Sequence, residues 1–268
     1  MIPAGFEYVR AGSVAEAIEL LGREDAKAIA GGHSLIPMLR LRFARPTLLV
    51  DIGRLDELRF VRDDGDRIAI GALSRHADLA LDPVLAQGCG LVSRTAGHVG
   101  DPQVRHRGTI GGSVAHGDPA SDLGTILLML DADFVARGPD GERVIPGTGF
   151  FTGPFESALG PQELLIEIRV PKMEGGAYVK HVRRAQDWAT VAVAAARVNG
   201  GTHVALAGVG PTPLRAGGVE QALAGGASIA DAAGHAADGT EPPSDVSGSS
   251  EYRSHLARVL TRQALERL

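Results

Sequence analysis

Two short glycine-rich segments, residues 30–34 and 108–113, constrain this chain more than any other feature of its sequence. Each contains two adjacent glycines, and glycine makes up 36 of the 268 residues, about twice its usual share. Because glycine lacks a Cβ, its backbone can approach a ligand closely, and successive amides in such a loop can form a concave site for phosphate oxygens. Two such loops could hold a diphosphate. Each is equally compatible with an ordinary tight turn, in which glycine is common.

The familiar catalytic and nucleotide motifs are absent from both segments. Neither segment has the spacing of a Walker loop or of a G-x-G-x-x-G turn, and Ser34 and Ser113 do not lie in G-x-S-x-G. His98, His106 and His116 are scattered, without the paired spacing that metal ligands show. We therefore predict neither a catalytic side chain nor a metal site in this chain.

Composition and charge exclude several classes of protein. With 44% hydrophobic and 22% charged residues, the chain is expected to fold. A net charge of −5 offers no basic field for nucleic acid. The single cysteine, Cys89, cannot by itself hold an iron–sulfur cluster or a structural zinc. We also find no signal peptide and no apolar run of about 18 residues, so we expect a cytoplasmic chain without a transmembrane segment.

Caps and hydrophobic periodicity predict alternating helices and strands in the first part of the chain. Ser13 and Glu16 form a capping box ahead of an apolar stripe at Val14, Ala17, Ile18 and Leu21. The further elements we expect are a strand at 27–30, a helix at 35–42, a strand at 47–51, a hairpin of 58–62 with 67–70, a helix from Pro83 to the mid-90s, a glycine loop, and a helix from Ser121 or Asp122 to Leu130.

A change of pattern near residue 175 predicts a second unit. A hairpin at 139–141 and a strand at 164–170 precede a Pro- and Gly-containing stretch. Beyond it we expect three antiparallel strands, 178–184, 190–198 and 203–209, and an amphipathic helix at 251–268 with Leu256, Val259, Leu260 and Leu265 on one side. The sequence thus predicts an α+β chain of two domains, 1–174 and 175–268.

Several charged and aromatic side chains lie beside the second glycine segment or in the second unit. Arg105 and Arg107 suit a phosphate or carboxylate, or equally a surface ion pair. Of Asp118 and Asp122, we expect one to cap the following helix, while the other could accept sugar-like hydroxyls. Trp188 is expected to pack in a core.

The chain contains several long motifs: AGGHSLIP at 30–37, LRLRFA at 39–44, TIGGS at 109–113, AHGDP at 115–119, DWAT at 187–190, SEYR at 250–253 and VLTR at 259–262. In this order they resemble the motifs of the FAD-binding medium subunits of molybdenum hydroxylases, the family of aerobic carbon monoxide dehydrogenase medium chains and xanthine dehydrogenase FAD subunits. The resemblance covers nearly the whole chain.

This resemblance implies a fold and a set of cofactor contacts. The fold would be a two-part FAD-binding domain of the PCMH type, followed by a small C-terminal α+β domain. The residues that would cradle the FAD diphosphate are Ala30, Gly31, Gly32, His33 and Ser34 with Thr109, Ile110, Gly111, Gly112 and Ser113. Asp122 would contact the sugar-like portion, Leu165 would provide a backbone or apolar contact, and Lys180 would lie near the flavin and favour negative charge on it. Arg105 and Arg107 are secondary candidates.

The resemblance also implies a function. FAD, bound noncovalently, would pass electrons from two two-iron clusters on a small partner subunit to an external acceptor, and a large partner subunit would hold the molybdenum cofactor and select the substrate. The complex would be a dimer of heterotrimers. A Gly-Gly-His sequence like Gly31-Gly32-His33 also occurs where flavin oxidases attach FAD covalently through histidine, but the Ser-Leu-Ile-Pro continuation favours noncovalent binding. The alternatives are a stand-alone FAD-dependent oxidoreductase and a noncatalytic flavin-binding module.

Overall fold

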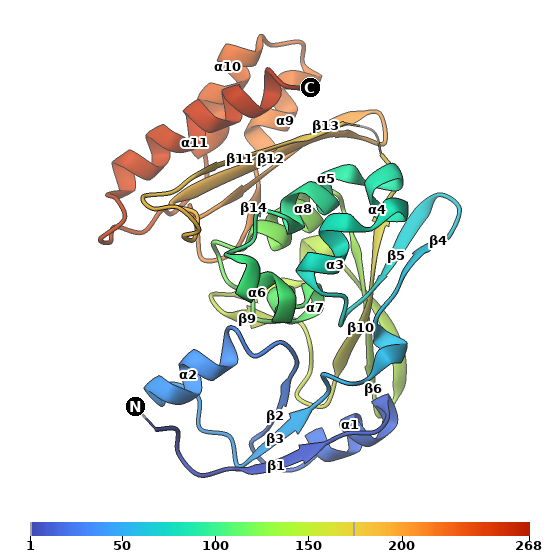
Figure 1. The fold of residues 1–268 in the computed structure, drawn as a ribbon. Coiled ribbons are helices and arrows are strands. Elements are labelled where there is room, and N and C mark those ends of the chain that lie inside the picture. The colour runs from blue at the N-terminus through green and yellow to red at the C-terminus, as the bar shows by residue number, and fades with distance from the viewer. Residues whose placement is uncertain (1, 174) are drawn as a thin grey trace.

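The chain forms three successive layered units, which the computed structural model describes over residues 2–173 and 175–268 (Figure 1). The expected domain boundary at Glu174 falls outside the described residues. The first unit lies at the bottom of Figure 1, the second in the middle and the third at the top. No described helix is long and apolar enough to cross a membrane.

The first unit is a three-stranded parallel sheet of order β1-β3-β2 with two helices. Its elements are β1 (Glu7–Arg10), α1 (Val14–Leu21), β2 (Ala26–Ile29), α2 (Leu35–Leu41) and β3 (Leu48–Asp51). The predicted capping box forms at α1, where Ser13 Oγ accepts a hydrogen bond from the Glu16 amide at 3.1 Å. The four predicted apolar residues of α1 are buried.

The second unit is a five-stranded antiparallel sheet of order β4-β5-β10-β6-β7. Its strands are β4 (Val61–Asp63), β5 (Arg67–Gly71), β6 (Asp133–Gly138), β7 (Gly141–Pro146) and β10 (Leu164–Pro171), and both predicted hairpins are confirmed. Short elements surround this sheet: η1 (Asp56–Leu58), η2 (Gly147–Gly149), β8 (Phe151–Gly153) and β9 (Glu156–Ser157).

The helices between β5 and β6 correct two predictions. They are α3 (His76–Leu81), α4 (Pro83–Gly88), α5 (Gly90–Ala96), α6 (Pro102–Arg107), α7 (Ile110–Ala115) and α8 (Asp122–Met129). The single helix predicted from Pro83 is broken at Cys89, whose φ of −151° is not helical and whose two glycine neighbours favour the break. Residues 102–107 and 110–115, which lie in the predicted glycine loop, are helical, and the side chains of Asp101 and Thr109 cap α6 and α7.

The third unit is a four-stranded antiparallel sheet covered by helices, and it corrects the predicted count of three strands. Its elements are β11 (Ala177–His181), β12 (Val191–Val198), β13 (Gly201–Ala207), β14 (Leu214–Arg215), α9 (Gly217–Ala224), α10 (Ile229–Gly234), η3 (His235–Ala237) and α11 (Ser250–Leu265). The missed strand, β14, is only two residues long. On α11, Val259 is 36% exposed and does not share the buried side with Leu256 and Leu260.

Strand β12 joins the third unit to the second. Ala194 and Ala196 belong to the core of the middle unit, whereas Val191, Val193 and Ala195 pack with the helices of the third. Because successive side chains of a strand point to opposite faces, a strand covered on both faces has an unbroken apolar sequence. The third sheet therefore lies directly against α8, where the candidate site begins.

Candidate functional site

A cavity of about 450 Å³ lies where the three units meet. Its wall includes the segment after β2, the start of α7, residues before α8, parts of β10 and β11, and residues 186–188. The cofactor residues that the resemblance implied lie in this wall except Ile110, which is fully buried in the core of the middle unit, and the secondary candidates Arg105 and Arg107 also lie outside it. Segments far apart in sequence therefore surround one space.

The first glycine segment is a turn that needs glycine at two positions. A Cβ on Gly31 would overlap the carbonyl oxygen of Arg107 and lie 2.8 Å from the Cα of Gly108. Gly32 has a φ of 81°, in the left-handed region that favours glycine. Ala30, Gly31 and Gly32 are followed in the wall by His33 and Ser34. The segment thus presents mainly backbone to the cavity.

The second glycine segment has a different structure from the first. Thr109 Oγ1 accepts a hydrogen bond from the Gly112 amide at 3.2 Å and caps α7. Gly111 lies in close contact with Ala72, since a Cβ there would be 2.6 Å from the Ala72 carbonyl oxygen. Thr109, Gly111, Gly112 and Ser113 line the cavity. The first turn of a helix therefore forms this part of the wall.

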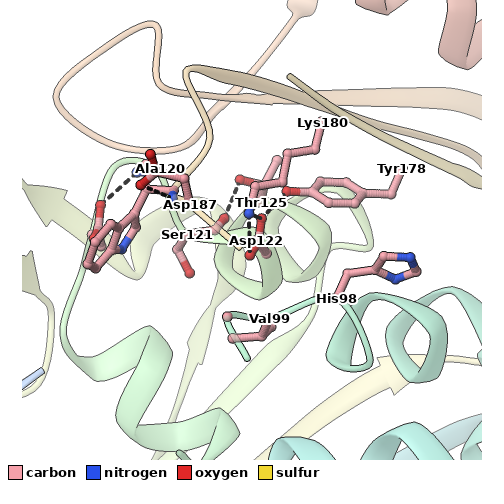
Figure 2. Close-up of polar contacts among 12 residues, drawn as sticks. His98, Val99, Ala120, Ser121, Asp122, Thr125, Tyr178, Lys180 and Asp187 are labelled. Atoms are coloured by element: carbon pink, nitrogen blue, oxygen red, sulfur yellow. Dashed lines mark hydrogen bonds and ion pairs between the residues drawn. The ribbon is translucent and has the colours of Figure 1, made fainter. Parts of the chain in front are cut away.

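At the same cavity, the Asp122 carboxylate holds two side chains of β11 (Figure 2). Asp122, at the start of α8, accepts a hydrogen bond of 2.5 Å from the Tyr178 hydroxyl and forms an ion pair of 3.0 Å with Lys180. The Lys180 and Asp122 side chains are only 16% and 10% exposed. Burial and the adjacent carboxylate raise the pKa of Tyr178 well above its ordinary value, so its hydroxyl stays protonated and donates to Asp122.

Neither aspartate caps α8, contrary to our expectation. Ser121 caps it by accepting from the Gly124 amide at 3.1 Å, and Asp118 accepts from the Ala120 amide at 2.8 Å within the preceding turn. A serine hydroxyl at the cap position leaves the Asp122 carboxylate free to face β11. The sequence left Ser121 and Asp122 as alternative caps at this helix start, and the structure confirms Ser121.

Other outcomes correct the sequence-based expectations or add to them. Trp188, predicted to pack in a core, is 71% exposed at the edge of the cavity. Arg105 and Arg107 do not line this cavity; Arg105 donates to the carbonyls of Val99 and Gly100 at 3.1 Å.

His76 is a residue of the cavity wall that sequence reasoning missed. Its ring lies against Gly108. Burial, together with the nearby His33 and Arg105, lowers the pKa of His76 to about 4.

Within the described residues, no group of three His, Cys, Asp or Glu side chains could hold a metal ion. Cys89 is buried, which raises the pKa of its thiol to about 11. The chemistry available at the cavity is therefore that of backbone groups, an ion pair, a neutral imidazole and an exposed indole.

Comparison with known proteins gives this cavity a context. Residues 4–173 match a family model described as the FAD binding domain in molybdopterin dehydrogenase, and residues 176–268 match the CO dehydrogenase flavoprotein C-terminal domain. The chain therefore belongs to the family of FAD-binding subunits of molybdenum hydroxylases, and it is an oxidoreductase subunit whose cofactor is FAD. The resemblance seen in the sequence is confirmed.

Individual relatives cover the whole chain. The carbon monoxide dehydrogenase medium chain of Hydrogenophaga pseudoflava is 42% identical over 99% of this chain and 97% of its own length. The glyceraldehyde dehydrogenase medium chain of Sulfolobus acidocaldarius is 38% identical over 99% of both chains. A solved carbon monoxide dehydrogenase from H. pseudoflava superposes with a TM-score of 0.95, covering 100% of this chain and 98% of that one at 42% identity.

Proposed function

We propose that this chain binds FAD noncovalently in the cavity and passes electrons from the iron–sulfur clusters of a partner subunit, through FAD, to an external acceptor. The observation that carries the proposal is the convergence of both glycine segments and the Asp122–Lys180 pair on one cavity in a chain of this family. FAD supplies a centre that accepts single electrons and releases a pair.

The residues of the cavity suit such a cofactor. At Gly31 a Cβ would collide with the backbone behind it, and at Gly112 it would lie 2.8 Å from Thr109 Oγ1 and disturb the cap. The wall therefore requires bare backbone, which lets phosphate oxygens come close. We assign the diphosphate to residues 30–34 and 109–113, with the qualification that the Ile110 side chain is in the core and only its backbone is available.

The opposite wall suits the other end of the cofactor. We assign Asp122 to the sugar-like portion of FAD and place the flavin ring near Lys180. Leu165 provides a further contact with the cofactor. The role of Lys180 is to favour negative charge at the flavin, while Asp122 holds its ammonium group in place and offsets part of its charge. The exposed indole of Trp188 offers a flat apolar surface at the cavity edge, which a ring system can cover.

Noncovalent attachment is tested by acid precipitation of the purified protein. His33 is exposed in the cavity wall and is the residue through which a covalent link would form. We expect all of the flavin in the supernatant after precipitation. Yellow colour that stays with the denatured chain would show covalent attachment and refute this part of the proposal.

We further propose that the chain works in a dimer of heterotrimers with a large molybdenum-containing subunit and a small iron–sulfur subunit. The relatives include medium chains of carbon monoxide and glyceraldehyde dehydrogenases and a nicotine 6-hydroxylase medium subunit. Because these names specify different substrates for similar medium chains, we assign substrate selection to another subunit. The two family models end at 173 and begin at 176, which supports a division into domains 1–174 and 175–268.

Purification of the tagged chain from its native host tests this function. A complex that contains molybdenum, iron and FAD is the expected result. A monomer that turns over a substrate by itself would favour a stand-alone oxidoreductase, and an isolated flavoprotein without electron transfer would favour a noncatalytic flavin-binding module. Neither alternative requires a partner subunit.

A further inference from the structure

Tyr178 is joined to the charged pair of the cofactor cavity but does not itself line the cavity. Its ring packs against the core of the middle unit and against a cluster of three buried alanines of the third unit. Its hydroxyl points at Asp122, which lines the cavity together with Lys180 (Figure 2). Tyr178 therefore reaches a ligand in the cavity through Asp122.

The pairing of β11 with β12 fixes the direction of both β11 side chains. Tyr178 lies opposite Ala194. In the same register, Lys180 lies opposite Ala192. Residues paired across antiparallel strands share one face of the sheet, and Ala194 belongs to the core of the middle unit. Because residues two apart in a strand also share a face, Tyr178 and Lys180 both point toward α8, where Asp122 lies in the first turn.

One oxygen of the Asp122 carboxylate contacts both partners. Oδ1 accepts the Tyr178 hydrogen bond at 2.5 Å and lies 3.0 Å from Lys180 Nζ. The same ammonium group donates to Oδ2 at 3.1 Å. Burial and the carboxylate raise the pKa of Tyr178, so its hydroxyl stays the neutral donor of this bond. Tyr178 and Lys180 thus share the negative charge of one carboxylate.

We propose that Tyr178 is a positioning residue that raises the flavin potential through Asp122, by taking up part of the carboxylate charge that otherwise offsets the Lys180 ammonium. This inference rests on the proposed function, which places the flavin near Lys180. Without the hydroxyl donor, the carboxylate would act on the ammonium alone, and less positive charge would remain at the flavin. Positive charge near a flavin favours its electron-rich reduced form, so the flavin potential would fall.

Spectroelectrochemical titration of FAD-loaded Tyr178→Phe tests this role. The variant keeps the ring and removes the hydroxyl, so we expect a lower flavin potential. The equilibrium constant for two-electron reduction should fall about threefold, which corresponds to about 14 mV. The matched control is Tyr8→Phe, which removes a tyrosine–aspartate hydrogen bond, to Asp51, at a pair that does not line the cavity. Its potential should equal that of wild type. An unchanged or raised potential in Tyr178→Phe would overturn the proposal.

The Asp122→Asn background tests whether Tyr178 acts through the carboxylate. In this background, Tyr178→Phe should leave the flavin potential unchanged, because the charge that the hydroxyl takes up is already gone. A shift that persists would show that Tyr178 does not act through Asp122, and the proposal would be wrong.

Urea unfolding of the FAD-free chain tests the hydrogen bond without the cofactor. The unfolding equilibrium constants of Tyr178→Phe, Asp122→Asn and the double variant should show a coupling of about tenfold, as expected for a hydrogen bond to a charged group. Additive effects would contradict the hydrogen bond, and coupling with an unchanged potential would leave Tyr178 a structural role only.

Flavin absorbance distinguishes failure of this inference from failure of the proposed function. Absence of FAD from the wild-type chain would refute the proposed function. Loss of FAD from Tyr178→Phe alone would refute this inference, because it assigns the hydroxyl to the flavin potential and not to FAD affinity.

Discussion

The two sides of the cofactor cavity are built by different means. The side formed by residues 30–34 and 109–113 presents backbone, held in place by contacts that leave no room for a Cβ at Gly31 or Gly111. The side formed by Asp122 and Lys180 presents a charged pair of side chains from α8 and β11, and Tyr178 donates a hydrogen bond to Asp122 from outside the wall. A backbone wall fixes the shape of a ligand site, whereas an ion pair adds an electrostatic field. We therefore expect changes to the first wall to affect cofactor affinity and changes to the second to affect the flavin potential.

The largest effect is expected for Gly31→Ala. The new methyl group would overlap the Arg107 carbonyl, and the backbone there is fixed because the Gly108 carbonyl accepts from the His76 amide at 3.1 Å. We expect loss of bound FAD and a decrease of about 3 kcal/mol in the free energy of unfolding, typical of severe overpacking. Flavin absorbance and urea unfolding measure the two effects.

The matched control is Gly217→Ala, where a Cβ would meet nothing within 4 Å. It should keep full FAD content and near wild-type stability. Wild-type FAD stoichiometry in Gly31→Ala would show that the backbone wall does not determine affinity.

A large pH-dependent effect on stability is expected at His76, which lies in the wall of the same cavity. Burial holds the pKa of this imidazole at about 4, whereas in the unfolded chain it is near 6.5. Between these values the unfolded state binds the proton and the folded state does not, so stability falls as pH decreases from 6.5 toward 4. The contribution lost is on the order of 3 kcal/mol. Urea unfolding between pH 7 and 4 should show a smaller loss for His76→Gln than for wild type, and parallel curves would contradict the assignment.

Substitutions in the Asp122–Lys180 pair should change the flavin potential and have little effect on FAD affinity, in contrast to substitutions in the backbone segments. Lys180→Met removes a positive charge and should lower the flavin potential, whereas Asp122→Asn removes its counter-charge and should raise it. Each shift is on the order of 30 mV, which corresponds to a tenfold change for a two-electron couple. Spectroelectrochemical titration measures both variants. Shifts of the same sign, or none, would show that this ion pair does not act on the flavin.

The two walls also differ in how far sequence predicts them. Adjacent glycines marked both backbone segments, and the Ser13–Glu16 box and the hairpins followed local rules that the structure obeys. The helical form of 110–113 was missed because adjacent glycines favour turns, whereas in the folded chain Thr109 caps the helix and Gly111 packs closely against Ala72.

The ion pair between Asp122 and Lys180 has no local signal in the sequence. Asp122 meets partners 56 and 58 residues away, on a strand of another unit. Its position before a helix marked Asp122 as a candidate, but only resemblance pointed to Lys180, and nothing pointed to Tyr178. The prediction that Trp188 is buried was wrong for a related reason. Residue type predicts burial only on average, whereas this indole lies at the mouth of a cavity formed by distant segments.

The smallest effect on stability and FAD affinity is expected for Thr109→Ala. This variant tests the geometry of the second segment while its glycines are unchanged. The change removes the cap on α7 and should cost about 1 kcal/mol of stability, with a modest loss of FAD affinity because Gly111 and Gly112 remain. Thr109→Ser retains the capping oxygen and is the matched control. Fluorescence titration with FAD compares the three proteins. If Thr109→Ala and Thr109→Ser weaken FAD binding equally, the Thr109 methyl group determines FAD affinity and the cap does not. The second segment would then act by packing, as Gly111 does against Ala72.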